Sequence, residues 1–291
     1  MQYHEPVFRP PSEASSFILQ VTLGCSWNKC AFCEMYTSKE FRPRPFANIA
    51  RDIEWMAKRE PAIQKIFLAD GDALVLSNNK LLPILKELSH YFGQGIRISA
   101  YATPQNILYK SHDELCALKN AGLQMIYYGV ESGDNLVLKK ICKGASAEQI
   151  AEGILRAKKA GITVSTTNLL GIAGKQYSKQ HTQSTAKLLS ETSPEFISFL
   201  MVMFPLGENR FRTCFGNDYD PLSPLELIQE LRETLSDLHV HNSQIRANHA
   251  SNYLPIKARF PTDKLKTLQL IDEVLNNPDT HKIKPEFLRG L

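Results

Sequence analysis

The most informative stretch of this chain is FILQVTLGCSWNKCAFC, residues 17–33. Its first seven residues form an apolar run typical of a buried strand. Three cysteines, Cys25, Cys30 and Cys33, follow that run within nine residues. Because soft thiolates select zinc, copper(I) or iron–sulfur clusters, the stretch predicts a metal-binding loop directly after a strand.

The number of cysteines separates two kinds of metal centre. A structural zinc site closes its tetrahedron with a fourth Cys or His at short spacing, and the nearest histidines, His4 and His90, are remote from the loop. Three cysteines on a 4Fe–4S cluster leave its fourth iron open to a small molecule. Buried thiols or a disulfide are the alternative, but clustered cysteines in a chain without secretory features more often bind metal.

Residues 24–36 resemble the cluster loop of the radical S-adenosylmethionine (SAM) superfamily. The commonest form of that loop has three residues between the first two cysteines, whereas this chain has four, residues 26–29. The C-x4-C-x2-C variant is similar to one found among Elp3-like and oxygen-independent coproporphyrinogen oxidase-like members. The resemblance implies that Cys25, Cys30 and Cys33 bind a 4Fe–4S cluster and that Phe32 packs beside the adenine of SAM. On its residue type alone, Phe32 can also be a core side chain.

Composition and charge exclude several classes of protein. The 291 residues carry 34 Lys and Arg against 30 Asp and Glu with no long basic run, so there is no strong nucleic-acid signal. The chain shows neither a signal peptide nor a stretch of roughly twenty apolar residues, which a membrane span requires. The other cysteines, Cys116, Cys142 and Cys214, are isolated from one another, which argues against a disulfide framework. We therefore expect a cytoplasmic protein that does not enter a membrane.

Short apolar runs alternate with longer amphipathic ones, which is the pattern of βα units around a parallel sheet. The predicted strands span residues 17–23, 65–69, 96–101, 125–130, 163–169 and 196–202. The predicted helices span residues 49–59, 80–91, 112–120, 135–141, 147–160 and 179–191. The pattern predicts an α/β fold with a partial (β/α)6 barrel of the TIM type, which is also the core that the resemblance implies.

The predicted domain organisation is a core barrel followed by an extension. The radical SAM core is expected at residues 1–205, and residues 206–291 are expected to close the barrel without forming an independent domain. Within this helical and irregular extension, helices are predicted at 224–238 and 262–276, with an irregular polar stretch at 240–253.

In parallel α/β folds, sites form at the carboxyl ends of the strands. Asp70, Gly71 and Asp72 follow the second predicted strand, where the superfamily carries a Gly-Gly-Glu-like motif that binds the methionine ammonium of SAM. The resemblance implies the same role here, with Asp70 in place of the first glycine, and a carboxylate suits the three donors of an ammonium. An Asp-Gly pair is also a common turn signal, so a structural role is the alternative.

Three later strand ends supply further candidates for the cofactor site. Tyr101, Glu131 and Gly171 lie at or after the third, fourth and fifth predicted strands. The resemblance implies that Glu131 accepts hydrogen bonds from the ribose hydroxyls of SAM and that Gly171 lets the backbone approach SAM closely. Alternatively, Ser132 or Asp134 caps the helix predicted at 135–141, and both roles can hold at once.

The polar run at residues 246–253 is the predicted substrate face. Its candidate residues are Arg246, Asn248, His249, Ser251 and Asn252. An arginine grips a carboxylate or phosphate with two hydrogen bonds, and a histidine can handle a proton near neutral pH. Alternatively, the run satisfies loop backbone groups and helix ends.

The resemblance implies a radical SAM enzyme. Its reduced 4Fe–4S cluster would cleave SAM to methionine and a 5′-deoxyadenosyl radical, which abstracts hydrogen from a substrate, here expected to be a small molecule. An electron donor of the flavodoxin or ferredoxin type is expected as a partner. The alternative is an iron–sulfur or zinc-binding redox or regulatory module without SAM turnover.

Overall fold

The computed structural model describes residues 1–278 and 283–290. Its main sheet has eight strands in the order β1-β4-β5-β6-β7-β8-β9-β10. They are β1 (Phe17–Gln20), β4 (Lys65–Ala69), β5 (Arg97–Ala102), β6 (Leu123–Glu131), β7 (Thr163–Leu170), β8 (Phe196–Met201), β9 (Ser243–Arg246) and β10 (Lys257–Phe260). Pairs β1–β4, β4–β5, β5–β6, β7–β8 and β8–β9 are parallel, whereas β9–β10 is antiparallel. The predicted α/β fold with a mostly parallel sheet is confirmed.

The chain divides into two compact units. Unit 1 comprises residues 1–28, 33–128 and 152–164, and unit 2 comprises residues 29–32, 129–151 and 165–291. Residues 206–291, predicted as an extension, therefore share a unit with residues 165–205.

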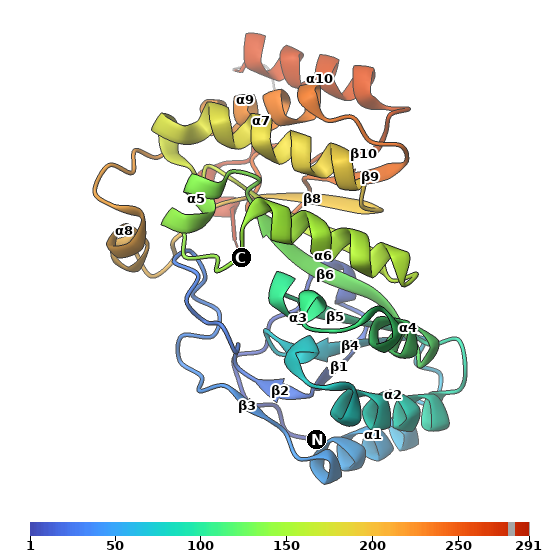
Figure 1. Ribbon diagram of the computed structural model, residues 1–291. Helices are drawn as coiled ribbons and strands as arrows, with labels where there is room; N and C mark the ends of the chain where they lie inside the picture. Colours follow the sequence, from blue (N-terminus) through green and yellow to red (C-terminus); the bar gives the residue numbers. More distant parts are fainter. Residues whose placement is uncertain (279–282, 291) are drawn as a thin grey trace. The chain divides into compact units, whose positions relative to one another are not determined.

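Unit 1 packs helices against β1, β4 and β5. Its helices are α1 (Phe46–Arg59), α2 (Asn78–Phe92), α3 (Pro104–Leu108) and α4 (His112–Asn120), with short 3₁₀ turns η1 (Pro11–Glu13) and η2 (Ala73–Val75). Helices α1 and α2 lie side by side, and α2 also contacts α4 (Figure 1). The buried faces of α1 and α2 carry apolar side chains such as Ile53 and Leu85, and the strand residues Leu19 and Phe67 are also buried. Ser111 caps α4 as predicted, since its side chain accepts from the Glu114 N–H at 3.1 Å.

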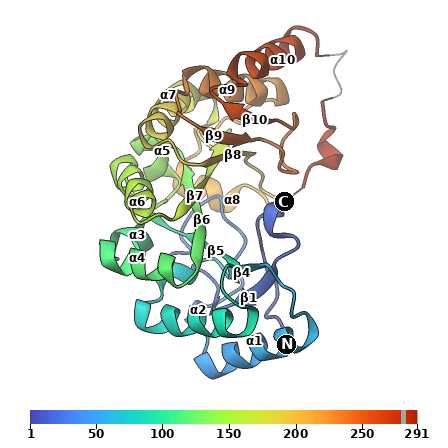
Figure 2. The same cartoon turned by 90° about the vertical axis from the view of Figure 1, so that its right-hand side faces the viewer.

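Unit 2 carries a stack of three helices. Its helices are α5 (Asn135–Lys140), α7 (Gly174–Thr192), α8 (Asn209–Phe215), α9 (Pro224–Asp237) and α10 (Lys264–Asn276), with the turn η3 (Glu286–Leu288); α6 (Ala147–Lys159) is divided between the units. Helix α9 contacts both α7 and α10 (Figure 2). Its buried side chains include Ile228, Glu230 and Leu231, so a carboxyl group enters a mostly apolar helix face.

Two of the predicted segments differ from the structure. The segment at 17–23 is interrupted, because β2 (Thr22–Leu23) leaves the main sheet and pairs antiparallel with β3 (Arg42–Pro43). The prediction of an irregular stretch at 240–253 is wrong over β9, which pairs with β8. Only Ser243 and Ile245 of that four-residue strand are buried, so its apolar signal was too short to be read as a strand.

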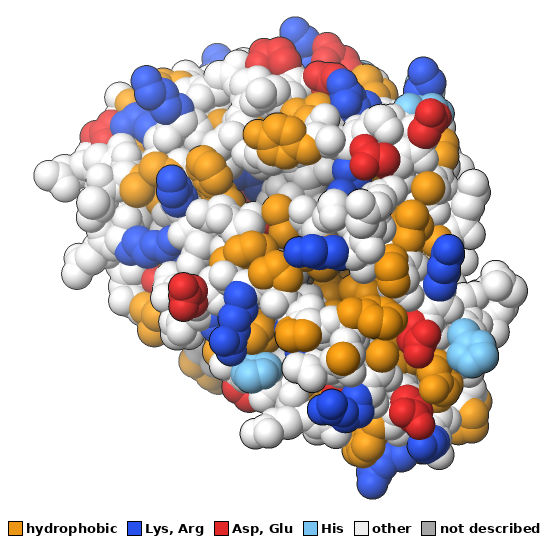
Figure 3. Space-filling view, turned by 60° about the horizontal axis from the view of Figure 1, so that its bottom comes forward, with side chains coloured by type: hydrophobic (Ala, Val, Ile, Leu, Met, Phe, Trp, Pro, Cys, Tyr) orange, Lys and Arg blue, Asp and Glu red, His pale blue; other side chains and the backbone are white. Residues whose placement is uncertain are grey.

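The surface carries no concentration of basic side chains on the face shown in Figure 3, where Lys and Arg are dispersed among acidic and apolar groups. Among residues 1–278 and 283–290, no helix combines the length and apolar character needed to cross a membrane.

Candidate functional site

The cysteine loop begins at a glycine turn next to the end of β1. The Val21 N–H still donates to the Ala69 carbonyl at 2.7 Å. The chain then turns at Gly24, whose φ of 72° favours glycine. A Cβ at Gly24 would also lie 3.2 Å from the Lys39 carbonyl oxygen. The direction in which the chain enters Cys25 is therefore fixed by this glycine.

Asp70 holds the start of the cysteine loop. Its buried carboxylate accepts hydrogen bonds from the Gly24 N–H at 3.0 Å and from Gln20 Nε2 at 3.1 Å. Lys39 Nζ forms an ion pair with the same carboxylate at 2.9 Å. Both carboxylate oxygens thus have partners within the protein, which fits a positioning role for Asp70.

Gly71 provides a close approach between the β4 end and the cysteine loop. A Cβ at this position would lie 3.0 Å from Cys25 Cβ and 2.5 Å from a ring atom of Tyr36. Burial raises the pKa of Tyr36, and the charges of Tyr101, Asp70 and then Cys33 and Cys25 raise it further. Burial likewise raises the pKa of Tyr101, with contributions from Tyr127 and then Cys33. In unit 1, Cys25 and Cys33 therefore lie in the surroundings of Gly71, Tyr36 and Tyr101.

Replacing Gly71 with alanine is expected to destabilise this part of unit 1. The added methyl group would overlap the Tyr36 ring, and overpacking of this kind costs about 1–3 kcal/mol. Urea unfolding of the protein as purified measures the loss. Gly290→Ala is the control, because a Cβ there meets no atom within 4 Å; equal unfolding free energies for the two variants would contradict the packing argument.

Asp72 is a buried carboxylate with unused hydrogen-bonding capacity. Ser26 Oγ donates to its Oδ2, while Oδ1 has no hydrogen-bond partner among the described residues. Burial raises the pKa of Asp72 to about 6, although the hydrogen bond from Ser26, the polar side chain of Asn106 and the charge of Lys110 act in the opposite direction. Because a buried acceptor is normally satisfied, the free side of this carboxylate fits a cationic group such as an ammonium.

Cys30 and Phe32 belong to unit 2, where the intervening Ala31 N–H donates to the Ile141 carbonyl at 2.9 Å, just after α5. Cys25, Cys30 and Cys33 are reduced and partly exposed. Among the described residues, no three His, Cys, Asp or Glu side chains form a group that could hold one metal ion. A cluster is a different arrangement, since it binds cysteines through several irons.

Glu131 ends β6 with a φ of 65° and pairs with a buried lysine. Its Oε1 accepts from Lys143 Nζ at 2.9 Å, whereas its buried Oε2 has no hydrogen-bond partner in the described part of the chain. The Lys143 N–H also donates to the Leu138 carbonyl at 3.0 Å, which closes the end of α5. The pair occupies one oxygen of the Glu131 side chain and leaves the other oxygen able to accept from a hydroxyl group.

Helix α7 holds the loop that follows Glu131. Ser132 Oγ lies 2.8 Å from His181 Nδ1, and the Gly133 N–H donates to Thr185 Oγ1 at 2.9 Å. Asp134 caps α5 by accepting from the Val137 N–H at 2.9 Å, one of the two predicted caps.

Gly171 follows the end of β7 in unit 2 with a φ of 78°. Its N–H donates to Glu230 Oε1 at 2.6 Å, and its carbonyl accepts from the Tyr219 hydroxyl at 3.0 Å. Both partners come from the segment after residue 205, so the C-terminal part of the chain shapes this loop.

The predicted substrate residues fall into two groups. His249 Nδ1 lies 2.9 Å from Ser251 Oγ, which accepts from the Met201 N–H at 3.2 Å, and Asn252 Nδ2 donates to the Phe199 carbonyl at 2.9 Å. These side chains therefore gather near the carboxyl end of β8, and Asn252 Oδ1 is buried without a hydrogen-bond partner in residues 1–278 and 283–290.

Arg246 lies in β9, away from the carboxyl end of β8. It pairs in register with Ser198, and its guanidinium lies 4.5 Å from the ring centre of Phe196, at the amino end of β8. Asn248 is exposed on the loop between β9 and β10.

Cys142 and Cys214 are brought together although they are isolated in the sequence. Burial raises the pKa of Cys142 to about 11, and its hydrogen bond with Cys214 contributes to the same shift. Cys116 lies instead in α4, 3.5 Å from His112 Nε2.

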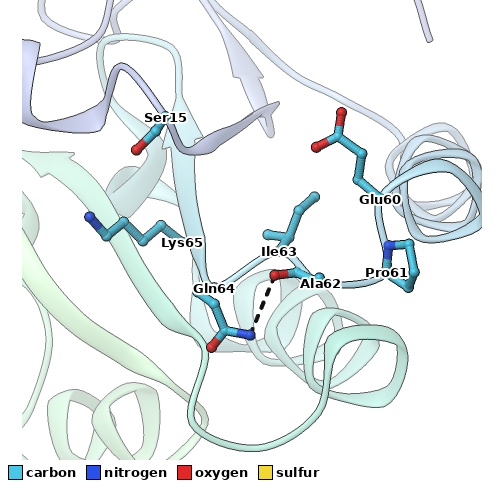
Figure 4. Close-up of a pocket in the computed structure, with 7 residues that line it drawn as sticks. All are labelled: Ser15, Glu60, Pro61, Ala62, Ile63, Gln64 and Lys65. Carbon is cyan, nitrogen blue, oxygen red and sulfur yellow. Dashed lines mark hydrogen bonds between the residues drawn. The ribbon is translucent and has the colours of Figure 1, made fainter.

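A pocket of about 410 Å³ lies at the opposite end of the unit 1 strands. It is lined by Ser15 and residues 60–65, and Gln64 Nε2 donates to the Ala62 carbonyl within it at 3.4 Å (Figure 4). Lys65 begins β4, whereas Asp70 follows its end. Because parallel α/β folds place chemistry at carboxyl ends, this pocket is separate from the candidate site.

Several residues of the candidate site had no assigned role in the sequence. Ser26 and Tyr36 lie in the cysteine loop itself, so their proximity to the cysteines was a usable local signal. Lys143 and Glu230 had no such local signal, because their contacts with Glu131 and Gly171 depend on tertiary folding.

A family model of the radical SAM superfamily matches residues 19–189, more than half of the 291 residues. The chain belongs to this superfamily, whose enzymes use a 4Fe–4S cluster, SAM, a reductant and a substrate. The predicted superfamily and its cofactors are thereby confirmed.

The similarity to individual relatives extends over only part of their length. The chain is 23% identical to heme chaperone HemW of Buchnera aphidicola over 181 residues, which is 59% of this chain and 46% of that protein. It is 30% identical to GTP 3′,8-cyclase of Alkaliphilus metalliredigens over 149 residues, 51% of this chain and 43% of that protein. The chain thus spans less than half the length of these relatives.

The fold is similar to that of coproporphyrinogen III oxidase (HemN) of Escherichia coli. The TM-score is 0.57 at 18% identity, with 76% of this chain and 51% of that chain covered. The similarity supports the predicted partial barrel, and the described sheet runs from β1 to β10 without closing.

Proposed function

We propose that this protein is a radical SAM enzyme acting on a small-molecule substrate. Cys25, Cys30 and Cys33 would bind a 4Fe–4S cluster. When bound, the cluster and SAM supply reductive cleavage of SAM to methionine and a 5′-deoxyadenosyl radical, which abstracts hydrogen. Beyond family membership, the observation that carries the proposal is the buried Asp72 carboxylate, which accepts a hydrogen bond from Ser26, the residue after Cys25, and keeps its Oδ1 without a partner among the described residues.

Asp72 would bind the methionine ammonium of SAM. Its unpartnered Oδ1 is an acceptor, and charge-assisted hydrogen bonds between a carboxylate and a cation are roughly twice as strong as neutral ones. Asp70 and Gly71 would act beside it by holding Gly24 and by leaving room for Cys25 and Tyr36.

The other residues proposed to bind SAM lie mostly at the ends of strands. Glu131 would accept from the ribose hydroxyls through its unpartnered Oε2. The Gly171 loop would approach SAM through backbone, and Phe32 would pack beside adenine. Tyr101, whose surroundings include Cys33, would exclude water from the cysteine loop.

Substrate selection is proposed for the loop that follows β9. His249, Ser251 and Asn252 share contacts near the end of β8, and Asn252 Oδ1 has acceptor capacity to spare. Asn248 is exposed on the same loop. Arg246 would select an anionic group only after giving up its stacking on Phe196.

The proposed partner is a small reducing protein of the flavodoxin or ferredoxin type, because cleavage of SAM needs a single electron. A cytoplasmic location accords with three thiols that must remain reduced to bind iron.

Electron paramagnetic resonance of the reconstituted protein tests the proposal. After anaerobic loading with iron and sulfide and reduction with dithionite, SAM is expected to change the signal of the reduced cluster by binding its open iron. Adenosine, which lacks the amino and carboxylate groups, is the matched control and should leave the signal unchanged. A signal indifferent to SAM, or a protein that binds zinc alone, would overturn the assignment.

A further inference from the structure

Helix α9 carries a buried carboxylate that reaches the end of β7. We propose that Glu230 is a positioning residue that fixes the Gly171 loop in the conformation that binds SAM. The inference rests on the proposed function, but Glu230 lies beyond residues 19–189 matched by the superfamily. It therefore assigns a cofactor-organising role to the C-terminal segment of this chain.

Both carboxylate oxygens of Glu230 accept hydrogen bonds from residues in or near this loop. Oε1 accepts from the Gly171 N–H at 2.6 Å, and Oε2 accepts from Ser178 Oγ in α7. The side chain is fully buried, and burial raises its pKa to about 7 while these two hydrogen bonds lower it. Burying a carboxylate is costly, so its retention for two donors at a strand end indicates a role beyond packing.

The Gly171 backbone has little freedom to adopt another conformation. Its φ of 78° favours glycine, and a Cβ would lie 2.6 Å from a methyl carbon of Leu227 in α9. The Tyr219 hydroxyl holds the carbonyl on the other side at 3.0 Å. Further along, the Lys175 N–H donates to the Asp220 carbonyl at 2.9 Å. The loop at 171–175 is therefore held at both ends by residues 219–230.

The same buried network extends to the loop after β6. His181 Nε2 lies 4.0 Å from Glu230 Oε1, and Nδ1 lies 2.8 Å from Ser132 Oγ. Burial lowers the pKa of His181 to about 4, so the imidazole is neutral near pH 7. Glu230 and the neutral His181 thus lie next to each other between the residue after Glu131 and the Gly171 turn, both within unit 2.

Backbone hydrogen exchange and SAM affinity test this inference together. In the wild type, the Gly171 amide should be protected from exchange. Glu230→Ala should speed its exchange by about tenfold, since the hydrogen bond to the buried Glu230 side chain is lost. The SAM dissociation constant of the cluster-loaded protein should rise about tenfold, a factor that equals about 1.4 kcal/mol. Glu230→Gln keeps an acceptor for Gly171 and should restore most of both properties.

Glu233→Ala is the matched control, because Glu233 lies in the same helix and accepts from Gln229 Nε2 at 2.8 Å, while it reaches Glu230 through its charge alone. An unprotected Gly171 amide in the wild type would overturn the inference whatever the variants do. So would unchanged exchange and SAM affinity in a folded Glu230→Ala protein. If wild-type protein binds no SAM at all, the proposed function fails, and the exchange data alone still decide whether Glu230 holds the loop.

Discussion

Replacing Cys30 with alanine is expected to abolish cluster binding and SAM cleavage while the fold persists. Cys30 lies in a short loop segment attached to unit 2 by the Ala31–Ile141 hydrogen bond, so the substitution removes a ligand without emptying the core. Iron and sulfide content after reconstitution, together with 5′-deoxyadenosine release, measures the loss. The melting temperature of the metal-free variant should stay within a few degrees of wild type, because surface substitutions usually change stability by less than about 0.5 kcal/mol.

Cys214→Ala is the control for the loss of a thiol as such. Cys214 is exposed in α8, and its contact is with Cys142. This variant is expected to retain a full cluster. A Cys30→Ala protein that keeps wild-type iron content and activity would contradict the three-cysteine site.

Replacing Asp72 with asparagine is expected to weaken SAM binding by about 10- to 100-fold, because a charge-assisted hydrogen bond is worth about 1.5–3 kcal/mol. Asparagine keeps the shape of the side chain and an acceptor for Ser26, so cluster content should be unchanged. Equilibrium dialysis with labelled SAM measures the affinity. Ser12→Ala, whose hydroxyl contacts Tyr127 elsewhere in unit 1, serves as the control.

The pH dependence of Asp72 gives two effects of opposite sign. Because burial raises its pKa from 3.8 to about 6, the neutral acid is favoured in the fold. That stabilisation is complete below about pH 4 and is lost as the pH rises through 6, a difference on the order of 3 kcal/mol. SAM binding needs the carboxylate, so affinity should increase over the same interval.

The asparagine variant separates these effects. It should be at least as stable as wild type at pH 7.5 and should lose the step in SAM affinity near pH 6. Parallel pH profiles for the two proteins would show that Asp72 does not contact the ammonium.

The sequence was sufficient for the architecture where short strand-like runs alternated with longer amphipathic segments. Strand β4 has four consecutive buried residues after Lys65, and β7 has six buried residues among its eight. Both strands were predicted to within one residue. Strand β9 was missed because only two of its four residues face the core. The break at Val21 depended on pairing with residues 42–43, which no local pattern reveals.

In the candidate site, the sequence predicted residues that a local motif identifies, but it did not predict partners that lie far away along the chain. The cysteines and Asp72 could be selected because motif and strand-end position identify them. The partner of Glu131 is Lys143, twelve residues later, and the partner of Gly171 is Glu230 in a distant helix. Such pairs depend on which helix faces which strand end. Arg246 shows the reverse case, since a residue suited to anion binding stacks on an aromatic ring.

Quantifying 5′-deoxyadenosine and methionine by mass spectrometry tests the central claim most directly. The anaerobically reconstituted protein, reduced with dithionite and given SAM, is expected to release both products, and the unreduced protein neither. An intact cluster that neither binds nor cleaves SAM would contradict the account and favour a redox or regulatory module.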